Sequence, residues 1–146
     1  MRWAMLKVFT RAGIAFQYPG NWTVEAEDDG AAWTVTVSSP GTAFAIISLR
    51  PEALTPAEVI DETLNALKAE YKELDAEPVV ESLGGLPAVG HDIDFLTLDT
   101  SIACRSRCVG TADGNLLAFT QVSELDRGQY EIVLRAMLRS VTIADG

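Results

Sequence analysis

The sequence predicts an α+β fold in which helices pack on an antiparallel β-sheet. Strand-like segments occupy both halves of the chain, and only two stretches have the three- and four-residue apolar spacing of a helix. Asp113-Gly114, between two strand-like segments, is the strongest hairpin signal in the chain. No Pro/Gly/Ser linker or repeat divides the 146 residues, so we expect one domain over residues 1–146.

The first half of the chain begins with short strands. Turn residues at 19–21, 28–30 and 39–42 separate segments of apolar or alternating character. Residues 33–37 alternate with a period of two and form a predicted hairpin with residues 44–49. The strands expected here are residues 6–10, 14–18, 22–25, 33–37 and 44–49.

A helix follows these strands. Thr55 is a suitable N-cap, Pro56 stands where a missing N–H is tolerated, and Glu58 completes a capping box. One apolar stripe then predicts that the helix lies on a core with its other face in water. The residues of this stripe are Ile60, Leu64, Leu67, Tyr71 and Leu74.

Strands return after this helix. The expected segments are residues 79–83, 87–98, 102–109 and 116–122. A second helix is expected to start at Asp126, with Gln129 three residues later, and residues 141–143 end the chain as an extended segment. The alternation of apolar and charged residues in 89–109 also predicts a hairpin register.

That register assumes an even-numbered loop centred on Asp99-Thr100. It places acidic residues across from basic ones, whereas a one-residue slip would mix charged and apolar faces. The expected pairs are Asp94 with Arg105, Asp92 with Arg107, Phe95 with Cys104, Ile93 with Ser106, and His91 with Cys108. Because Arg105 and Arg107 would compete with a cation, Asp92 and Asp94 are interpreted as ion-pair partners rather than metal ligands.

The two cysteines and the one histidine allow one catalytic hypothesis. Cys104 and Cys108 are four residues apart, about 13 Å on a strand, too far for a disulfide or a shared metal, so both are expected to be buried free thiols. If His91 faces Cys108, the pair could form a thiol nucleophile or line a small-ligand pocket. No residue that would orient His91 and no oxyanion hole is recognisable, so this hypothesis is an alternative.

Composition argues against several other functions. The net charge is -10 without a basic cluster, so nucleic acid is not an expected partner. One His and two Cys cannot build a closed zinc site, and Gly84-Gly85 leads into a strand rather than a helix, so we expect no metal and no cofactor. The acidic residues Glu58, Asp61 and Glu62 near the start of the first helix could instead form a protein-binding surface.

The sequence also gives an expectation for location. No apolar run approaches the roughly 18 residues that a membrane-spanning helix needs. The first ten residues lack the uninterrupted apolar stretch of a signal peptide. We therefore expect a soluble, cytoplasmic protein.

Three motifs resemble the PsbP-like superfamily, whose members include PsbP, the Ran-release factor, DcrB and LpqN. Residues 13–24, with Tyr18-Pro19-Gly20-Asn21-Trp22, resemble its opening strand and turn. Residues 83–88 resemble the Gly-Gly-x-Pro-Ala start of its long hairpin, and residues 130–141 resemble its closing helix. The resemblance covers residues 13–143. It implies an α-β-α sandwich and a non-enzymatic module that binds another macromolecule, and it carries over no catalytic residues.

The leading hypothesis is a bacterial, non-catalytic binding or adaptor domain with a protein partner, as a monomer or homodimer. One alternative is a chaperone for secretion-effector segments, which would need an exposed apolar groove. The other alternative is the thiol enzyme or small-ligand protein that uses Cys108 and His91.

Overall fold

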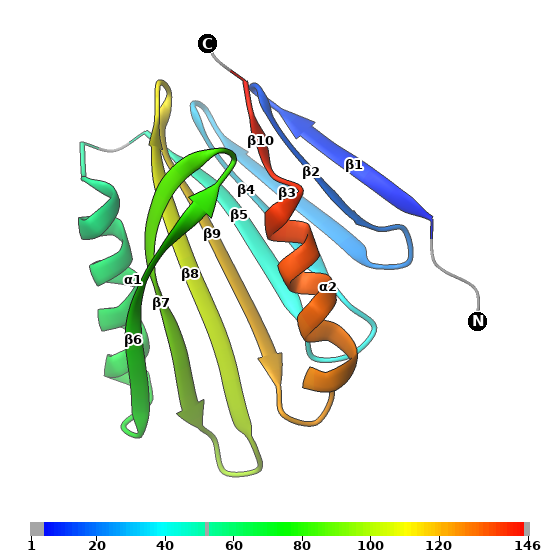
Figure 1. Cartoon of the computed structure of the whole chain (residues 1–146), viewed down its shortest axis with the longest axis vertical. Coiled ribbons are helices and arrows are strands. Elements are labelled where there is room, and N and C mark those ends of the chain that lie inside the picture. Colours follow the sequence, from blue (N-terminus) through cyan, green and yellow to red (C-terminus); the bar gives the residue numbers. More distant parts are fainter. Residues whose placement is uncertain (1–4, 52, 145–146) are drawn as a thin grey trace.

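A computed structural model of the chain describes residues 5–51 and 53–144. The elements in chain order are β1 (Leu6–Arg11), β2 (Ile14–Pro19), β3 (Thr23–Asp29), β4 (Ala32–Ser38), β5 (Phe44–Arg50), α1 (Pro56–Glu70), β6 (Leu74–Leu83), β7 (Leu86–Leu96), β8 (Ser101–Thr111), β9 (Gly114–Ser123), α2 (Arg127–Arg139) and β10 (Thr142–Ile143) (Figure 1). Each strand and helix expected from the sequence is present, with shifted ends.

The strands form two sheets. The larger has the order β3-β4-β5-β9-β8-β7-β6, and the smaller has the order β1-β2-β10. All of their pairings are antiparallel, which confirms the predicted antiparallel sheet. In the large sheet, β9 lies between β5 and β8, and β7 and β6 follow β8 at one edge. The helix α1 lies toward this same edge.

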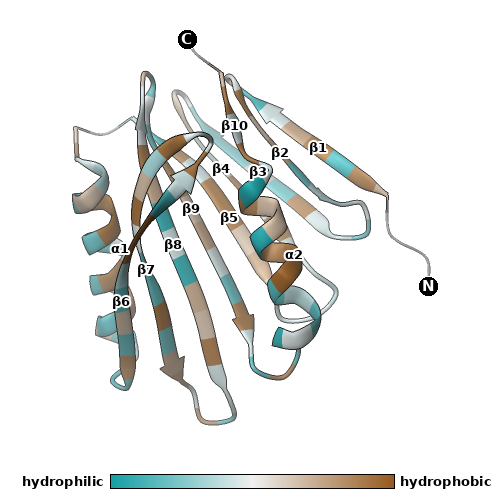
Figure 2. Ribbon diagram, in the orientation of Figure 1, coloured by the Kyte–Doolittle hydropathy of each residue, from teal (hydrophilic) through white to brown (hydrophobic). Residues whose placement is uncertain are grey.

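Each helix packs on its own face of the large sheet. Apolar and polar residues alternate along the long strands, which gives each strand two different faces (Figure 2). Under α1, Leu64 packs in a cluster with residues such as Ile93 and Phe119. On the opposite face, Leu134 of α2 and Phe16 of the small sheet share one core with strands β4, β5 and β9. The small sheet thus takes part in covering the α2 face.

The first helix ends earlier than its apolar stripe predicts. Its capping box is present, with Thr55 as N-cap, but α1 stops at Glu70 and Leu74 begins β6. Tyr71 stacks on Phe95 with ring centroids 3.9 Å apart. Leu74 is paired with the same Phe95 in the ladder. The apolar stripe therefore extends beyond the end of the helix, because residues of the helix and of the following strand pack in the same cluster.

The second helix starts at the predicted position. Asp126 is its N-cap residue but makes no side-chain cap hydrogen bond. Its carboxylate instead accepts hydrogen bonds from the Thr42 hydroxyl and from the Thr42 backbone N–H, the latter at 2.8 Å. Asp126 therefore ties the start of α2 to the loop before β5.

The predicted register of the β7–β8 hairpin is wrong by two residues. Asp94 lies opposite Ala103 and not Arg105, Asp92 lies opposite Arg105, and His91 lies opposite Ser106. The remaining changed pairs are Ile93 with Cys104, Phe95 with Ile102, and Cys108 with Val89. The Thr97 N–H donates to the Thr100 carbonyl at 2.8 Å, so the loop is centred on Leu98-Asp99, one residue earlier than predicted. An even displacement leaves each side chain on its predicted face.

The described part of the chain holds no helix that combines the length and the apolar character needed to cross a membrane.

Candidate functional site

The two thiols lie in the core on the α1 side. Cys108 is fully buried in a cluster with Val59, Ile60 and Leu117, and Cys104 is 2% exposed. Burial raises the pKa of Cys104 to about 12 and that of Cys108 to about 11. Both cysteines are free, as predicted. Neither thiol is placed as an accessible nucleophile.

The structure does not bring His91 and Cys108 together as the sequence predicted. His91 lies opposite Ser106, and its backbone N–H donates to the Ser106 hydroxyl at 3.1 Å. Cys108 lies opposite Val89, so His91 and Cys108 are diagonal neighbours about 7 Å apart. No hydrogen bond joins the imidazole to the thiol within the described residues, and the Nδ1 atom of His91 is buried without a hydrogen-bond partner, so the two side chains do not form a thiol–imidazole pair.

The acidic residues of α1 lie at its N-terminal end. Glu58 accepts a hydrogen bond from the Thr55 N–H at 3.0 Å, and the Thr55 hydroxyl accepts one from the Glu58 N–H at 3.2 Å. Hydrogen bonding to the Glu58 carboxylate by the Thr55 backbone, and then by the Thr55 side chain, lowers the pKa of Glu58. Asp61 and Glu62 are exposed on the same helix. Glu58 thus has a capping role, and Asp61 and Glu62 remain available to solvent.

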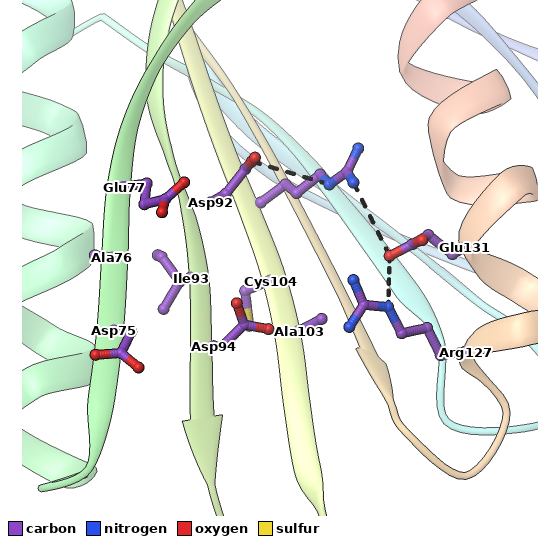
Figure 3. Close-up of a pocket in the computed structure, with 11 residues that line it drawn as sticks. Asp75, Ala76, Glu77, Asp92, Ile93, Asp94, Ala103, Cys104, Arg127 and Glu131 are labelled. Atoms are coloured by element: carbon purple, nitrogen blue, oxygen red, sulfur yellow. Dashed lines mark hydrogen bonds and ion pairs between the residues drawn. The ribbon is translucent and has the colours of Figure 1, made fainter.

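A charged groove lies on the other face, between α2 and strands β6, β7 and β8 (Figure 3). Its first part is a cavity of about 480 Å³. The lining residues are Asp75, Ala76, Glu77, Asp92, Ile93, Asp94, Ala103, Cys104, Arg105, Arg127 and Glu131. Five of these side chains are carboxylates and two are guanidinium groups. This part of the groove is therefore predominantly acidic.

Like charges face each other across the β6–β7 ladder in this cavity. Asp75 lies directly opposite Asp94, and Glu77 lies directly opposite Asp92. Like charges at directly opposed positions of an antiparallel ladder are destabilising. Among the described residues, Asp75, Glu77 and Asp94 make no ion pair that would offset this repulsion. Folding alone does not explain why carboxylates occupy these opposed positions.

Ion pairs cross the middle of the groove. The Arg105 guanidinium lies 3.9 Å from the Asp92 carboxylate and 4.0 Å from the Glu131 carboxylate. Glu131 also accepts from Arg127 at 2.8 Å within α2. Figure 3 shows this series of contacts from β7 through β8 to the helix. The charges in the middle of the groove are therefore mutually compensated.

Arg107 anchors the floor beneath these charges. Its side chain is 2% exposed, and it donates to Glu81 at 2.5 Å and to Asp92 at 2.8 Å. Its remaining donors reach the backbone carbonyls of His91 at 3.1 Å and Ser106 at 2.9 Å. One buried guanidinium thus links β6, β7 and β8, which fixes the strands that carry the carboxylates.

The groove continues into a second, basic cavity of about 300 Å³. Its lining residues are Glu81, Ser82, Leu83, Arg105, Arg107, Arg135, Leu138 and Arg139. A small cavity of about 20 Å³ between them shares Arg105 and Glu131 with the acidic cavity, and Arg105 and Arg135 with the basic one. Arg135 and Arg139 are exposed and make no ion pair with other described residues. We call the two cavities and the small one between them the α2 groove.

This arrangement is suited to binding charged groups. Within residues 5–51 and 53–144, no three His, Cys, Asp or Glu side chains are placed to hold a metal ion. Cys108 packs in the core under α1, and Cys104, although it borders the acidic cavity, is 2% exposed and packs in the same cluster as Leu64 of α1. What the groove offers to a ligand is carboxylates at one end and guanidinium groups at the other.

The groove was not predicted from the sequence, although Asp92, Asp94, Arg105 and Arg107 were singled out as ion-pair partners. Its other charged residues come from β6 and α2, which are distant in sequence. One signal was available: acids alternate in Asp75-x-Glu77 as they do in Asp92-x-Asp94, which places each pair on one strand face. The strand order that sets β6 beside β7 was needed to connect the two pairs.

Comparison with known proteins gives the fold. No family model matches the chain, and no curated protein matches it. A Pseudomonas aeruginosa protein of unknown function, PA94, is 12% identical with a TM-score of 0.59, over 98% of this chain and 100% of that one. LpqN of Mycobacterium tuberculosis, described as involved in cell envelope biogenesis, is 12% identical with a TM-score of 0.55, over 96% and 91%. The cyanobacterial PsbP of Synechocystis is 18% identical with a TM-score of 0.53, over 97% and 94%. The chain has a PsbP-like fold.

Proposed function

We propose that this protein is a non-catalytic binding module and that a protein partner binds in the α2 groove. The observation that carries the proposal is the distribution of ion pairs along this groove. Asp92, Arg105 and Glu131 neutralise one another in the middle, whereas Asp75 and Asp94 at one end and Arg135 and Arg139 at the other have no protein partner among the described residues. Unpaired charges around a concave surface are available to a ligand.

The residues with nucleophilic chemistry support binding rather than catalysis. Cys108 has no exposed surface, and burial raises its pKa to about 11, so it is protonated near neutral pH. His91 lies opposite a serine rather than the thiol. The alternative of a thiol enzyme therefore lacks a hydrogen bond between nucleophile and base within the described residues.

The charge of the groove also favours an adaptor over a chaperone for apolar segments. An apolar segment would leave Asp75, Asp94 and the arginines desolvated without partners, which is unfavourable. A polar polypeptide segment can supply the missing charges. The α1 residues Asp61 and Glu62 form the competing candidate surface, on the opposite face of the sheet.

Site-specific photo-crosslinking tests the proposal. A benzophenone amino acid is placed in the full chain at Ser82, which lines the basic cavity, and in a control at Ala69, which is exposed on α1. Both replaced side chains are small and uncharged, so the two variants match in charge. The protein is expressed in its native host and irradiated there.

We expect a discrete adduct with one other protein at Ser82 and none at Ala69. The Arg135→Glu/Arg139→Glu variant should reduce the Ser82 adduct at least fivefold, because it reverses the charge at that end of the groove. No adduct at Ser82, or equal adducts at both positions, would contradict the proposal. An adduct at Ala69 alone would assign binding to the α1 face.

A further inference from the structure

We infer that the α2 groove selects a polypeptide segment with separated charges, in which basic side chains occupy the acidic cavity and acidic side chains occupy the basic cavity. This inference rests on the proposed function and names the chemistry of the partner. It is carried by the order of charges along the groove together with the ion pairs that leave only its two ends unpaired.

The acidic cavity is suited to basic side chains of a partner. Asp75 and Asp94 are exposed and directly opposed, and Glu77 extends the same face of β6. A cationic side chain between two opposed carboxylates would convert their repulsion into attraction. The nearest arginines of the groove are already engaged, since Arg105 contacts Asp92 and Glu131, and Arg127 contacts Glu131.

The basic cavity is suited to carboxylates of the same segment. Arg135 and Arg139 are one turn apart on α2 and face the cavity that Arg105 and Arg107 also line. Basic residues near a helix C-terminus complement the helix dipole, which accounts for Arg139 by itself. The dipole does not account for the convergence of β8 arginines on the same cavity. This convergence is notable in a chain with 21 acids and 11 bases.

The length of the groove sets the length of the segment. The rise from Arg127 to Arg139 along α2 is about 18 Å at 1.5 Å per residue. An extended chain covers about 18 Å in five or six residues at 3.3 Å per residue. A segment with two basic residues, a spacer of one or two residues and two acidic residues therefore matches the groove.

Three blocked peptides of identical composition test the charge order. They are Lys-Lys-Gly-Gly-Glu-Glu, the reverse sequence, and the alternating Lys-Glu-Gly-Gly-Lys-Glu. All three are neutral overall, so the protein's net charge of -10 attracts none of them preferentially. Each is titrated at low salt into the uniformly ¹⁵N-labelled full chain, and dissociation constants are obtained from amide chemical shifts.

We expect at least one of the charge-separated peptides to bind at least threefold more tightly than the alternating peptide. The shifted amides should lie in β6, β7 and α2. Asp75→Lys/Asp94→Lys and Arg135→Glu/Arg139→Glu should each weaken this binding at least fivefold. The matched control Asp61→Lys/Glu62→Lys, on α1, changes the net charge equally to the first variant and should leave the affinity unchanged. Combining both groove variants should restore binding, because the peptide can lie in the opposite direction.

Several results would overturn the inference. These are equal affinity for the alternating peptide, unchanged affinity in both groove variants, or no binding of any peptide. Concentration-dependent shifts of the groove amides without peptide would assign the groove to a second copy.

Circular dichroism spectra that match the parent chain establish that each variant folds. If the lysine variant does not fold, the neutral pair Asp75→Asn/Asp94→Asn replaces it. Crosslinking at Ser82 without a preference for separated charges would overturn this inference and leave the proposed function standing.

Discussion

Replacing Arg107 with methionine should destabilise the fold by about 3 kcal/mol, through the loss of four hydrogen bonds that join β6, β7 and β8. Hydrogen bonds to charged groups contribute roughly 1.5–3 kcal/mol each. Glu81 and Asp92 are 49% and 42% exposed and regain water when the guanidinium is removed, which reduces their share to roughly 1 kcal/mol each. The carbonyls of His91 and Ser106 lose a buried donor, which adds roughly 1 kcal/mol more.

Urea titration monitored by tryptophan fluorescence measures this loss, because Trp22 and Trp33 are buried in the core. A loss of about 3 kcal/mol also lowers Tm by roughly 9 °C for a domain of this size. Arg139→Met is the matched control, since Arg139 is exposed and makes no ion pair among the described residues, and it should change stability by less than about 0.5 kcal/mol. A loss below about 1 kcal/mol for Arg107→Met would refute the role assigned to these hydrogen bonds. An increase in stability would mean that desolvation of the guanidinium outweighs them.

Three further predictions concern backbone contact, thiol ionisation and helix capping. Gly90→Ala should destabilise the fold by at least about 2 kcal/mol in the same urea assay, because a Cβ at this position would lie 1.7 Å from a backbone oxygen of β8; a smaller loss would mean that the strands separate easily. Cys104 and Cys108 should react with iodoacetamide at pH 8 only after unfolding, and rapid labelling of either thiol in the native protein would contradict their burial. Burial raises the pKa values of Cys104 and Cys108 to about 12 and 11. The two thiols should therefore contribute fully to the free energy of unfolding below the ordinary thiol pKa near 9, and this contribution should be lost as pH rises toward 12. Cys→Ala variants should show a smaller fall in stability over this pH range. Thr55→Ala should cost about 1 kcal/mol of stability. Hydrogen bonds from Thr55 lower the pKa of Glu58, so the pair stabilises the fold above the ordinary glutamate pKa of 4.5 and loses this effect as pH falls below it. An unchanged acid limb of the stability profile in Glu58→Gln would contradict the capping role.

The elements were predictable because local patterns determine them. The capping box of Thr55 and Glu58 located the start of α1, and alternation located each long strand. The end of α1 was misplaced because Tyr71 and Leu74 would pack on the same core whether they continued the helix or, as observed, followed it. Both are buried against Phe95, one from the helix cap and one from the next strand.

The register of the central hairpin shows a different limit. Alternation fixes whether the register is odd or even, so the faces of Asp92 and Asp94 were predicted correctly. The choice among even registers was made from charge pairs between adjacent strands. Asp92 does bind the Arg107 side chain at 2.8 Å, but from a diagonal position, because Arg107 also reaches Glu81 on the third strand. Long side chains can thus form ion pairs between diagonal positions, so a charge pair does not fix which residues lie directly opposite each other.

The remaining charges of the groove separate structural from ligand-directed roles. Arg107 is buried and fully occupied by its partners, and its removal should cost stability; this is the behaviour of a structural ion-pair centre. Asp75 and Asp94 oppose each other without a counter-ion among the described residues, so changing either should cost little stability or increase it. Sites where a sequence departs from local stability rules are expected to be functional. The same variants therefore provide a test of this division: Arg107→Met should lower stability, whereas Asp75→Asn/Asp94→Asn should preserve stability and lower the affinity for a charge-separated peptide.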